Sequence, residues 1–207
     1  MANFITILRL LLLFGIFLIL DSSGLYGHLL AFFLTIVVIV LDAVDGIVAR
    51  WRKETSEFGS VLDIVVDRIV ENCFWIYFAA RGVISVWIPF LIISRGFFTD
   101  GIRSIALSKG MTAFGEKSLQ KSALGKAVVS SRFSRGFYGL SKILAFLSLI
   151  TLQMLALPEA ESLVADAVRN AVIVSCYGVV YFTVAYCIIR GIPVFLDSKS
   201  FLSRAKN

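Results

Sequence analysis

Four aspartates occupy one short stretch of this sequence, in two pairs that flank a polar loop. Asp42 and Asp45 are three residues apart, and Asp63 and Asp67 are four residues apart. On a helix, either spacing places both carboxylates on the same face. Because only a short polar loop joins the two segments, we expect their helices to be antiparallel neighbours on which the four carboxylates converge. Like charges in one site need counter-charge, and all-oxygen ligation suits Mg²⁺ or Mn²⁺ rather than Zn²⁺. Two such ions about 3.5–4 Å apart form the usual clamp for phosphoryl chemistry, so the pattern predicts a two-metal site.

The chain that must position these carboxylates has the composition of an integral membrane protein. Its 207 residues are 58% hydrophobic and 16% charged, whereas a soluble domain is roughly 45–50% apolar and about 25% charged. We expect one all-α domain over residues 1–207, a six-transmembrane-helix bundle, because apolar runs long enough to span recur six times. These runs are Phe4–Leu20, His28–Arg50, Gly59–Ala80, Val83–Arg103, Phe137–Leu157 and Leu163–Val194.

The distribution of basic residues predicts the orientation of the bundle. Lysines and arginines gather between spans two and three, between spans four and five, and in the tail, whereas the opposite loops carry few. By the positive-inside rule both termini are cytoplasmic, and the aspartates face the cytoplasm, at the inner membrane if the source is bacterial. The N-terminal run is expected to be the first span rather than a signal peptide, because Arg9 interrupts it and no small-residue cleavage site follows.

A family resemblance is carried by the two aspartate segments. Residues 42–50 read DAVDGIVAR and, after eight further residues, residues 59–67 read GSVLDIVVD. This pattern resembles the signature of the CDP-alcohol phosphatidyltransferase family, and the six-span architecture is similar to that of the family. The resemblance implies transfer of a phosphatidyl group from CDP-diacylglycerol to an alcohol with release of CMP. It also implies two Mg²⁺ or Mn²⁺ ions per site and a homodimer in the lipid bilayer, and no nucleic-acid partner is expected.

The resemblance also implies roles for individual residues. The four aspartates would hold the cations, and Asp67 would in addition be the general base for the acceptor hydroxyl. An N-terminal element, NFIT, resembles one that lies near the nucleotide in the family. With that element included, the positions that would bind the CDP-lipid are Asn3, Thr6, Gly46, Arg50, Ser56 and Gly59.

The acceptor alcohol is indicated by basic residues that follow the fourth span. Arg95 and Arg103 are eight residues apart and share roughly one helix face, and three more basic residues follow: Lys126, Arg132 and Arg135. Such a cluster suits an acceptor that carries a phosphate, although topology or contacts with anionic lipids are the simpler explanation of the same residues.

Phosphatidylglycerophosphate synthases are the branch that this chain resembles most, which implies sn-glycerol 3-phosphate as the acceptor. Three positions depart from that branch: Ile64 and Arg68 stand where proline and lysine are usual, and Gly96 replaces a glutamate. Inositol phosphate is therefore the alternative acceptor, ahead of serine or choline.

A cation transporter is the alternative from another functional class, because intramembrane aspartates also mark ion pathways. A transporter should carry polar residues and helix breaks deep within several spans, with access from both faces. Here the acidic and basic residues gather toward one face, and spans such as Phe137–Leu157 have few deep polar groups. The sequence therefore favours the enzyme.

Overall fold

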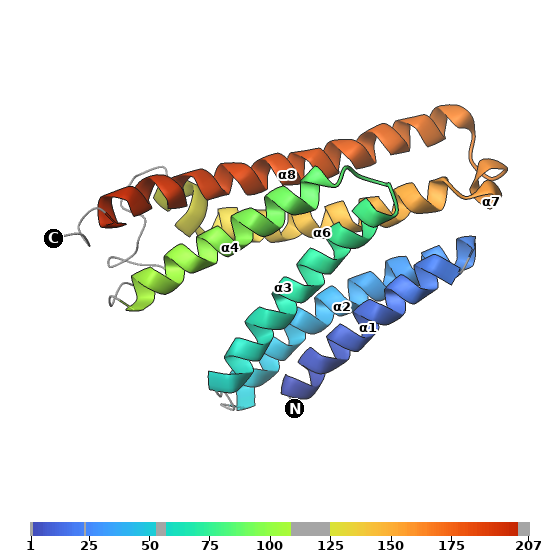
Figure 1. The fold of residues 1–207 in the computed structure, drawn as a ribbon. Helices are drawn as coiled ribbons and strands as arrows, with labels where there is room; N and C mark the ends of the chain where they lie inside the picture. The colour runs from blue at the N-terminus through green and yellow to red at the C-terminus, as the bar shows by residue number, and fades with distance from the viewer. Residues whose placement is uncertain (1, 23, 53–56, 109–124, 203–207) are drawn as a thin grey trace.

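The computed structural model describes residues 2–22, 24–52, 57–108 and 125–202, and it describes side chains at 4–22, 24–42, 59, 61–108, 125, 127–129 and 131–198. Within these ranges the regular elements are helices (Figure 1). They are α1 (Ala2–Ser22), α2 (Leu25–Arg52), α3 (Glu57–Ala80), α4 (Trp87–Ser108), the π-helical turn η1 (Lys126–Ser130), α6 (Arg132–Leu155), α7 (Pro158–Glu161) and α8 (Asp166–Leu202).

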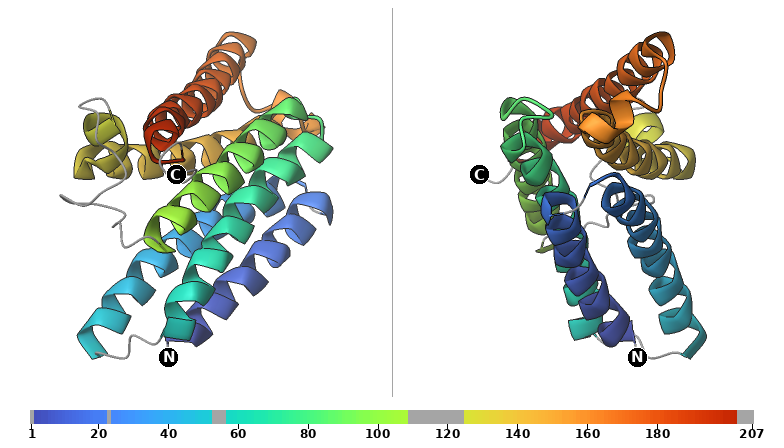
Figure 2. Two further views of the ribbon diagram at one scale, coloured as in Figure 1. Left: turned by 60° about the vertical axis from the view of Figure 1, so that its left-hand side comes forward. Right: turned by 90° about the vertical axis from the view of Figure 1, so that its right-hand side faces the viewer.

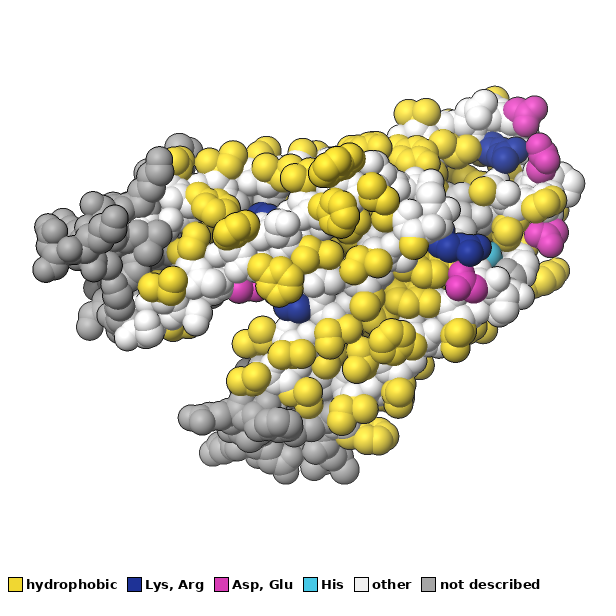
Figure 3. All heavy atoms as spheres, in the orientation of Figure 1, with side chains coloured by type: hydrophobic (Ala, Val, Ile, Leu, Met, Phe, Trp, Pro, Cys, Tyr) yellow, Lys and Arg dark blue, Asp and Glu magenta, His cyan; other side chains and the backbone are white. Residues whose placement is uncertain are grey.

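The long helices form two groups that share one end of the molecule. α1 packs against α2 and α3, while α8 packs against α6 and α4. The contacts of α2 with α6 and of α3 with α4 join the groups, which diverge toward the end where α1 begins (Figures 1 and 2). The space-filling view is hollowed between these diverging ends, and acidic and basic side chains lie at the edge of the hollow (Figure 3).

The helices present apolar side chains outward as well as inward. On α1, Phe4, Leu11 and Leu18 are seven residues apart and 71%, 65% and 70% exposed, whereas Leu13 and Ile16 on the opposite face are fully buried. Hydrophobic side chains likewise cover most of the face seen in Figure 3. A surface of this kind is suited to contact with lipid tails rather than water.

An aromatic cluster fastens α3 to its neighbours. Phe74 of α3 is fully buried and stacks on Phe146 of α6 with ring centroids 4.6 Å apart. Phe17 of α1 packs edge-to-face against Phe74, with ring centroids 5.4 Å apart. Pairs of this geometry stabilise a core by about 0.5–1.5 kcal/mol each beyond the area that they bury. The cluster therefore fixes α3, which carries two of the predicted metal ligands, against α1 and α6.

Four described helices are long and apolar enough to cross a membrane: Phe4–Ser22, Leu25–Asp42, Arg132–Leu155 and Asp166–Ser198. α3 and α4 are not among these four. The physical reason is their charge: α3 carries Asp63, Asp67, Arg68 and Glu71, and α4 carries Arg95, Asp100 and Arg103. The all-helical architecture is confirmed, and the count of six spans stays a prediction.

The helix ends differ from the expected ones by a few residues. The fifth expected span begins at Arg132 rather than Phe137, because the Ser131 side chain accepts a hydrogen bond from the backbone N–H of Ser134 at 3.0 Å and caps the helix. α8 continues through Pro193 to Leu202. Polar residues extend both helices beyond their apolar cores, which a hydropathy pattern cannot reveal.

Candidate metal and phosphate site

Three of the predicted carboxylates converge at the open end of the bundle. Asp63 and Asp67 lie one turn apart on α3, and Asp42 lies on α2. One carboxylate oxygen from each residue lies within 4.8 Å of the other two. Asp45 is in α2, but its side chain lies outside the described part. The expected convergence is thus confirmed for the three carboxylates that can be tested.

The helices that carry these aspartates are arranged differently from the expectation. The short loop suggested that the second and third spans are direct antiparallel neighbours. Within the described residues, α2 packs chiefly on α1 and α6, and α1 lies against both α2 and α3 (Figure 2). The first helix therefore brings the two aspartate-bearing helices together.

Arg9 of α1 supplies the counter-charge at this junction. It is only 3% exposed, and its Nη1 lies 2.6 Å from Asp42 Oδ1 and 3.5 Å from Asp63 Oδ1. Its Nη2 donates to Asp67 Oδ1 at 2.8 Å. One guanidinium thus meets three carboxylates, which leaves an excess of two negative charges among these four side chains. Sequence reasoning missed this role, although an arginine inside an apolar run was a signal.

The three aspartates fit the divalent cations that the sequence suggested. Their side chains are 42%, 44% and 47% exposed, so their oxygens are open to an ion. Oxygens bound to one Mg²⁺ at about 2.1 Å stand roughly 3–4 Å apart, close to the spacing of this group. Carboxylates are also the ligand type that Mg²⁺ and Mn²⁺ prefer.

A second group of charged residues, which we call the arginine cluster, consists of Arg68, Arg95, Arg103 and Arg190. They come from α3, α4 and α8, and Arg68, Arg95 and Arg190 lie close enough to Arg103 to repel its charge. Asp100 offsets part of this charge, because its two oxygens lie 2.8 and 2.7 Å from Arg68 Nη2. Arg68 follows Asp67 directly on α3, so the cluster meets the aspartates at this helix.

Arg95 is held against the backbone of α8. A methyl group added at Gly191 would lie 3.1 Å from Arg95 Cγ and 3.2 Å from its Nε, so glycine leaves room for this side chain. The Nε atom is buried and finds no hydrogen-bond partner among the described residues. A buried donor in that state is suited to an anionic ligand.

Arg190 is the cluster member that sequence reasoning missed. It is 5% exposed, donates to the Val128 carbonyl at 2.8 Å, and also bonds the Ser134 hydroxyl. Its guanidinium lies 5.2 Å from the ring centre of Tyr138. The signal was again a lone arginine within an apolar run, here counted as part of the last span.

The other predicted residues fall into three groups. Thr6 is buried one turn before Arg9, and Gly59 lies in the first turn of α3. Arg132 is exposed and Arg135 is half-buried at the start of α6. The remaining predictions concern side chains or residues outside the described part, namely Asn3, Asp45, Gly46, Arg50, Ser56 and Lys126.

Comparison with known proteins assigns the chain to a family. The model of the family described as CDP-alcohol phosphatidyltransferase matches residues 1–190. The chain belongs to this family. This match confirms the family resemblance that the sequence suggested.

Three relatives illustrate the range of names among similar proteins. A CDP-diacylglycerol–glycerol-3-phosphate 3-phosphatidyltransferase of Bacillus subtilis (strain 168) is 30% identical over 90 residues, 44% of this chain and 47% of that protein. A protein of the same name from Rickettsia bellii (strain RML369-C) is 27% identical over 163 residues, 73% of this chain and 90% of that protein. A putative cardiolipin synthase of Mycobacterium tuberculosis (strain ATCC 25618 / H37Rv) is 29% identical over 84 residues, 41% of this chain and 40% of that protein. The chain thus spans about half or less of the Bacillus and Mycobacterium proteins.

Proposed function

We propose that this CDP-alcohol phosphatidyltransferase family member transfers the phosphatidyl group of CDP-diacylglycerol to sn-glycerol 3-phosphate and releases CMP. The observation that carries the proposal is the adjacency of two sites of opposite charge. Half-exposed carboxylates converge on Arg9, and the arginine cluster adjoins them on α3, α4 and α8. The names of the Bacillus and Rickettsia relatives support glycerol 3-phosphate as the acceptor.

Asp67 is proposed to act as the general base. Its carboxylate is 47% exposed and can accept the proton of the acceptor hydroxyl. As the proton leaves, the hydroxyl oxygen attacks the phosphorus of the phosphatidyl group. The bond from that phosphorus to the CMP oxygen then breaks, and the electron pair leaves with CMP. Asp42, Asp45, Asp63 and Asp67 would hold two Mg²⁺ or Mn²⁺ ions, which, when bound, neutralise the diphosphate and stabilise the leaving CMP.

The arginine cluster is proposed to bind the phosphate of the acceptor. The buried Nε of Arg95 and the adjacent Arg103 offer charged donors to phosphate oxygens. Among the five basic residues predicted for this role, the cluster favours these two, and it adds Arg68 and Arg190. Asn3, Thr6, Gly46, Arg50, Ser56 and Gly59 are proposed for the CDP-lipid.

The topology and assembly state belong to the same proposal. α3 and α4 have 24 and 22 residues, about 36 and 33 Å of helix, which is enough to span the bilayer as two further helices. Both termini would then be cytoplasmic, and the protein would be a homodimer. A Ser85→Cys variant, substituted in the α3–α4 turn, should react at this position with an impermeant maleimide from the outside of intact cells. Labelling from the cytoplasmic side alone would contradict the topology.

The direct test of the function is CMP release by purified protein supplied with CDP-diacylglycerol. Mg²⁺ or Mn²⁺ should be required, and glycerol 3-phosphate should support release whereas glycerol should not. If inositol 1-phosphate supported faster CMP release than glycerol 3-phosphate, inositol 1-phosphate would replace it as the proposed acceptor. If folded protein released no CMP with any phosphorylated alcohol and did not bind CDP-lipid, the proposed reaction would be wrong.

A further inference from the structure

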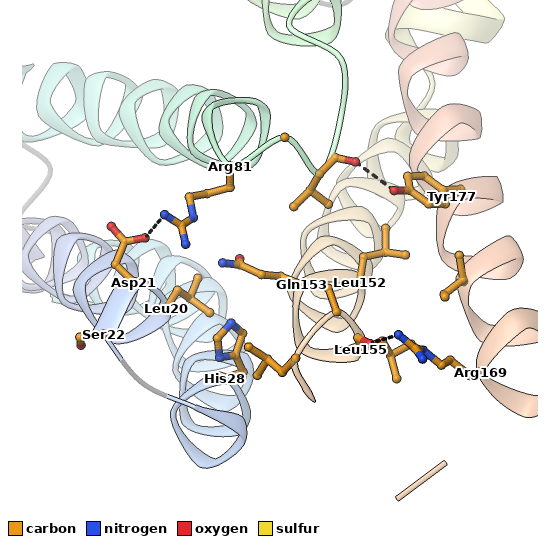
Figure 4. Close-up of a pocket in the computed structure, with 15 residues that line it drawn as sticks. Leu20, Asp21, Ser22, His28, Arg81, Leu152, Gln153, Leu155, Arg169 and Tyr177 are labelled. Carbon is orange, nitrogen blue, oxygen red and sulfur yellow. Dashed lines mark hydrogen bonds and ion pairs between the residues drawn. The ribbon is translucent and has the colours of Figure 1, made fainter. Parts of the chain in front are cut away.

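A cavity of about 590 Å³ lies at the end of the bundle opposite the aspartates (Figure 4). The α1–α2 and α3–α4 turns and the parts of α6 and α8 next to α7 enclose it. Asp21 at the cavity is twelve residues after Arg9 on α1, which corresponds to about 18 Å along the helix axis. The cavity is therefore separate from the metal and phosphate site.

Two buried hydrogen-bond acceptors in this cavity have no partner among the described residues. His28 is 1% exposed, and its Nδ1 lies 3.1 Å from the Gly24 carbonyl. Because a carbonyl only accepts, Nδ1 carries the proton, and Nε2 is an acceptor when the ring is neutral. His28 Nε2 and Gln153 Oε1 are both buried without a hydrogen bond. Both atoms therefore suit a ligand that donates hydrogen bonds, such as a hydroxyl group.

The cavity also contains two arginines whose ion pairs are long. Arg81 Nη1 lies 3.5 Å from Asp21 Oδ1, and Arg169 Nη1 lies 3.5 Å from Glu161 Oε1. Glu161 is 71% exposed, so water screens that pair. Arg169 Nη2 donates to the Leu155 carbonyl at 3.0 Å, whereas its Nε is buried and has no hydrogen bond to any described residue. These guanidinium groups retain capacity for an anion that approaches through the cavity.

The close-up shows how these groups share one space. Arg81 from the α3–α4 turn, His28 from α2 and Gln153 from α6 surround the same opening, and Arg169 lies beside Leu155 at the α8 side (Figure 4). Apolar residues such as Leu152 and Ile173 complete the wall. The combination of cationic donors, neutral acceptors and an apolar wall matches an amphipathic ligand with an anionic, hydroxylated head.

We propose that this cavity binds a phosphate ester that carries free hydroxyl groups. The arginines would contact the phosphate oxygens, while His28 Nε2 and Gln153 Oε1 would accept hydrogen bonds from the hydroxyls. A lipid headgroup and a soluble polyol phosphate share this chemistry. The inference goes beyond the proposed function, because the cavity is remote from the aspartates and from the arginine cluster.

The first test compares two lipids that differ only in hydroxyl groups. Detergent-solubilised full-length protein is titrated with phosphatidylglycerol and with phosphatidylethanol of the same acyl chains, and bound lipid is counted by native mass spectrometry. Phosphatidylglycerol should bind more tightly. His28→Phe should reduce its affinity to that of phosphatidylethanol and leave phosphatidylethanol binding unchanged. Arg169→Gln should weaken both lipids about tenfold, which is the effect of losing one charge-assisted hydrogen bond.

The second test substitutes exposed residues, so that the variants fold like the unaltered protein. Glu161→Gln removes the carboxylate that competes for Arg169 and should tighten phosphatidylglycerol binding about two- to threefold. Glu159→Gln removes the same charge from the same exposed helix, α7, and is the matched control that should leave binding unchanged. Equal binding of the two lipids by the unaltered protein, or equal effects of the two glutamate substitutions, would overturn the proposal.

A competition experiment distinguishes the two sources of the ligand. Glycerol 2-phosphate is added at millimolar concentration to protein that carries phosphatidylglycerol. Loss of the lipid from the unaltered protein but not from the Asp67→Asn variant would place the displacement at the metal site, and the cavity assignment would be wrong. Loss from both would identify a soluble polyol phosphate as a ligand of the cavity, and retention in both would identify the lipid headgroup.

Discussion

The aspartate group (Asp42, Asp63 and Asp67 with Arg9) and the arginine cluster carry opposite net charges and meet at α3. In the first, one buried cation meets three carboxylates that are each nearly half exposed. In the second, Asp100 contacts Arg68 and Arg103, two of the four arginines. Neither group is neutral on its own, and each is suited to a ligand of the missing charge. The difference suits the proposed division of the site, in which cations and the nucleotide diphosphate would lie on one side and an anionic acceptor on the other.

The largest loss of activity is expected from Asp67→Asn, in the aspartate group. The substitution removes the proposed base and a metal ligand with almost no change in volume. The turnover number should fall on the order of a thousandfold, the scale of general base catalysis, while circular dichroism shows an unchanged helix content. CMP release measured at saturating substrates provides the test, and turnover within a few-fold of the original would remove Asp67 from its assigned role.

Arg95→Gln tests whether the arginine cluster binds the acceptor and not the CDP-lipid. The loss of a charge-assisted hydrogen bond to phosphate should raise KM for the acceptor about 10- to 100-fold and leave KM for CDP-diacylglycerol nearly unchanged. Arg95→Lys keeps the charge and should recover part of the loss. Steady-state kinetics with each substrate varied in turn checks this, and an equal rise in both KM values would contradict the division.

Arg9→Gln probes the counter-charge within the aspartate group. The guanidinium contacts oxygens that a metal ion would use, so its removal should increase affinity for Mn²⁺ several-fold. Without metal, the uncompensated carboxylates should lower the melting temperature. Free Mn²⁺ can be followed by electron paramagnetic resonance in the absence of substrate. Weaker Mn²⁺ binding by the variant would show that Arg9 supports the ion rather than competing with it.

The smallest expected effect comes from Gly191→Ala. The added methyl group would meet Arg95 at 3.1 Å, so that side chain must shift by a few tenths of an ångström. KM for the acceptor should rise about two- to fivefold, a fraction of the Arg95→Gln effect. Gly178→Ala is the matched control on the same helix, because a methyl group there has nothing within 4 Å. Similar kinetics for both variants would show that Gly191 does not position Arg95.

The sequence revealed the acidic half of the site better than the helices that assemble it. The spacing of Asp42, Asp63 and Asp67 was enough to predict their convergence, because a helix converts spacing into a shared face. The position of α1 between α2 and α3 was not predictable in the same way. It depends on packing between distant segments, such as Phe17 against Phe74, which local patterns do not encode.

The basic half was predicted less completely for a related reason. Arg95 and Arg103 were found because they share one helix face. Arg190 lies 87 residues after Arg103, and only the packing of α8 against α4 brings them together. Arg9 and Arg190 were both visible in the sequence as cations within apolar runs. This position alone indicates that each arginine has a charged or polar partner, since membrane-embedded charges need one.

The length of α8 also sets the level at which the two substrates would meet. Arg190 is 24 residues after Asp166, about 36 Å along the axis, whereas the hydrocarbon core is about 30 Å thick. With Asp166 at one interface, Arg190 stands at the opposite water boundary even at a tilt of about 20°. A spin label at Ile192 should therefore be relaxed by a water-soluble reagent more than by oxygen. A water-soluble acceptor could then react from the aqueous phase, while the acyl chains of the proposed lipid donor stay in the bilayer.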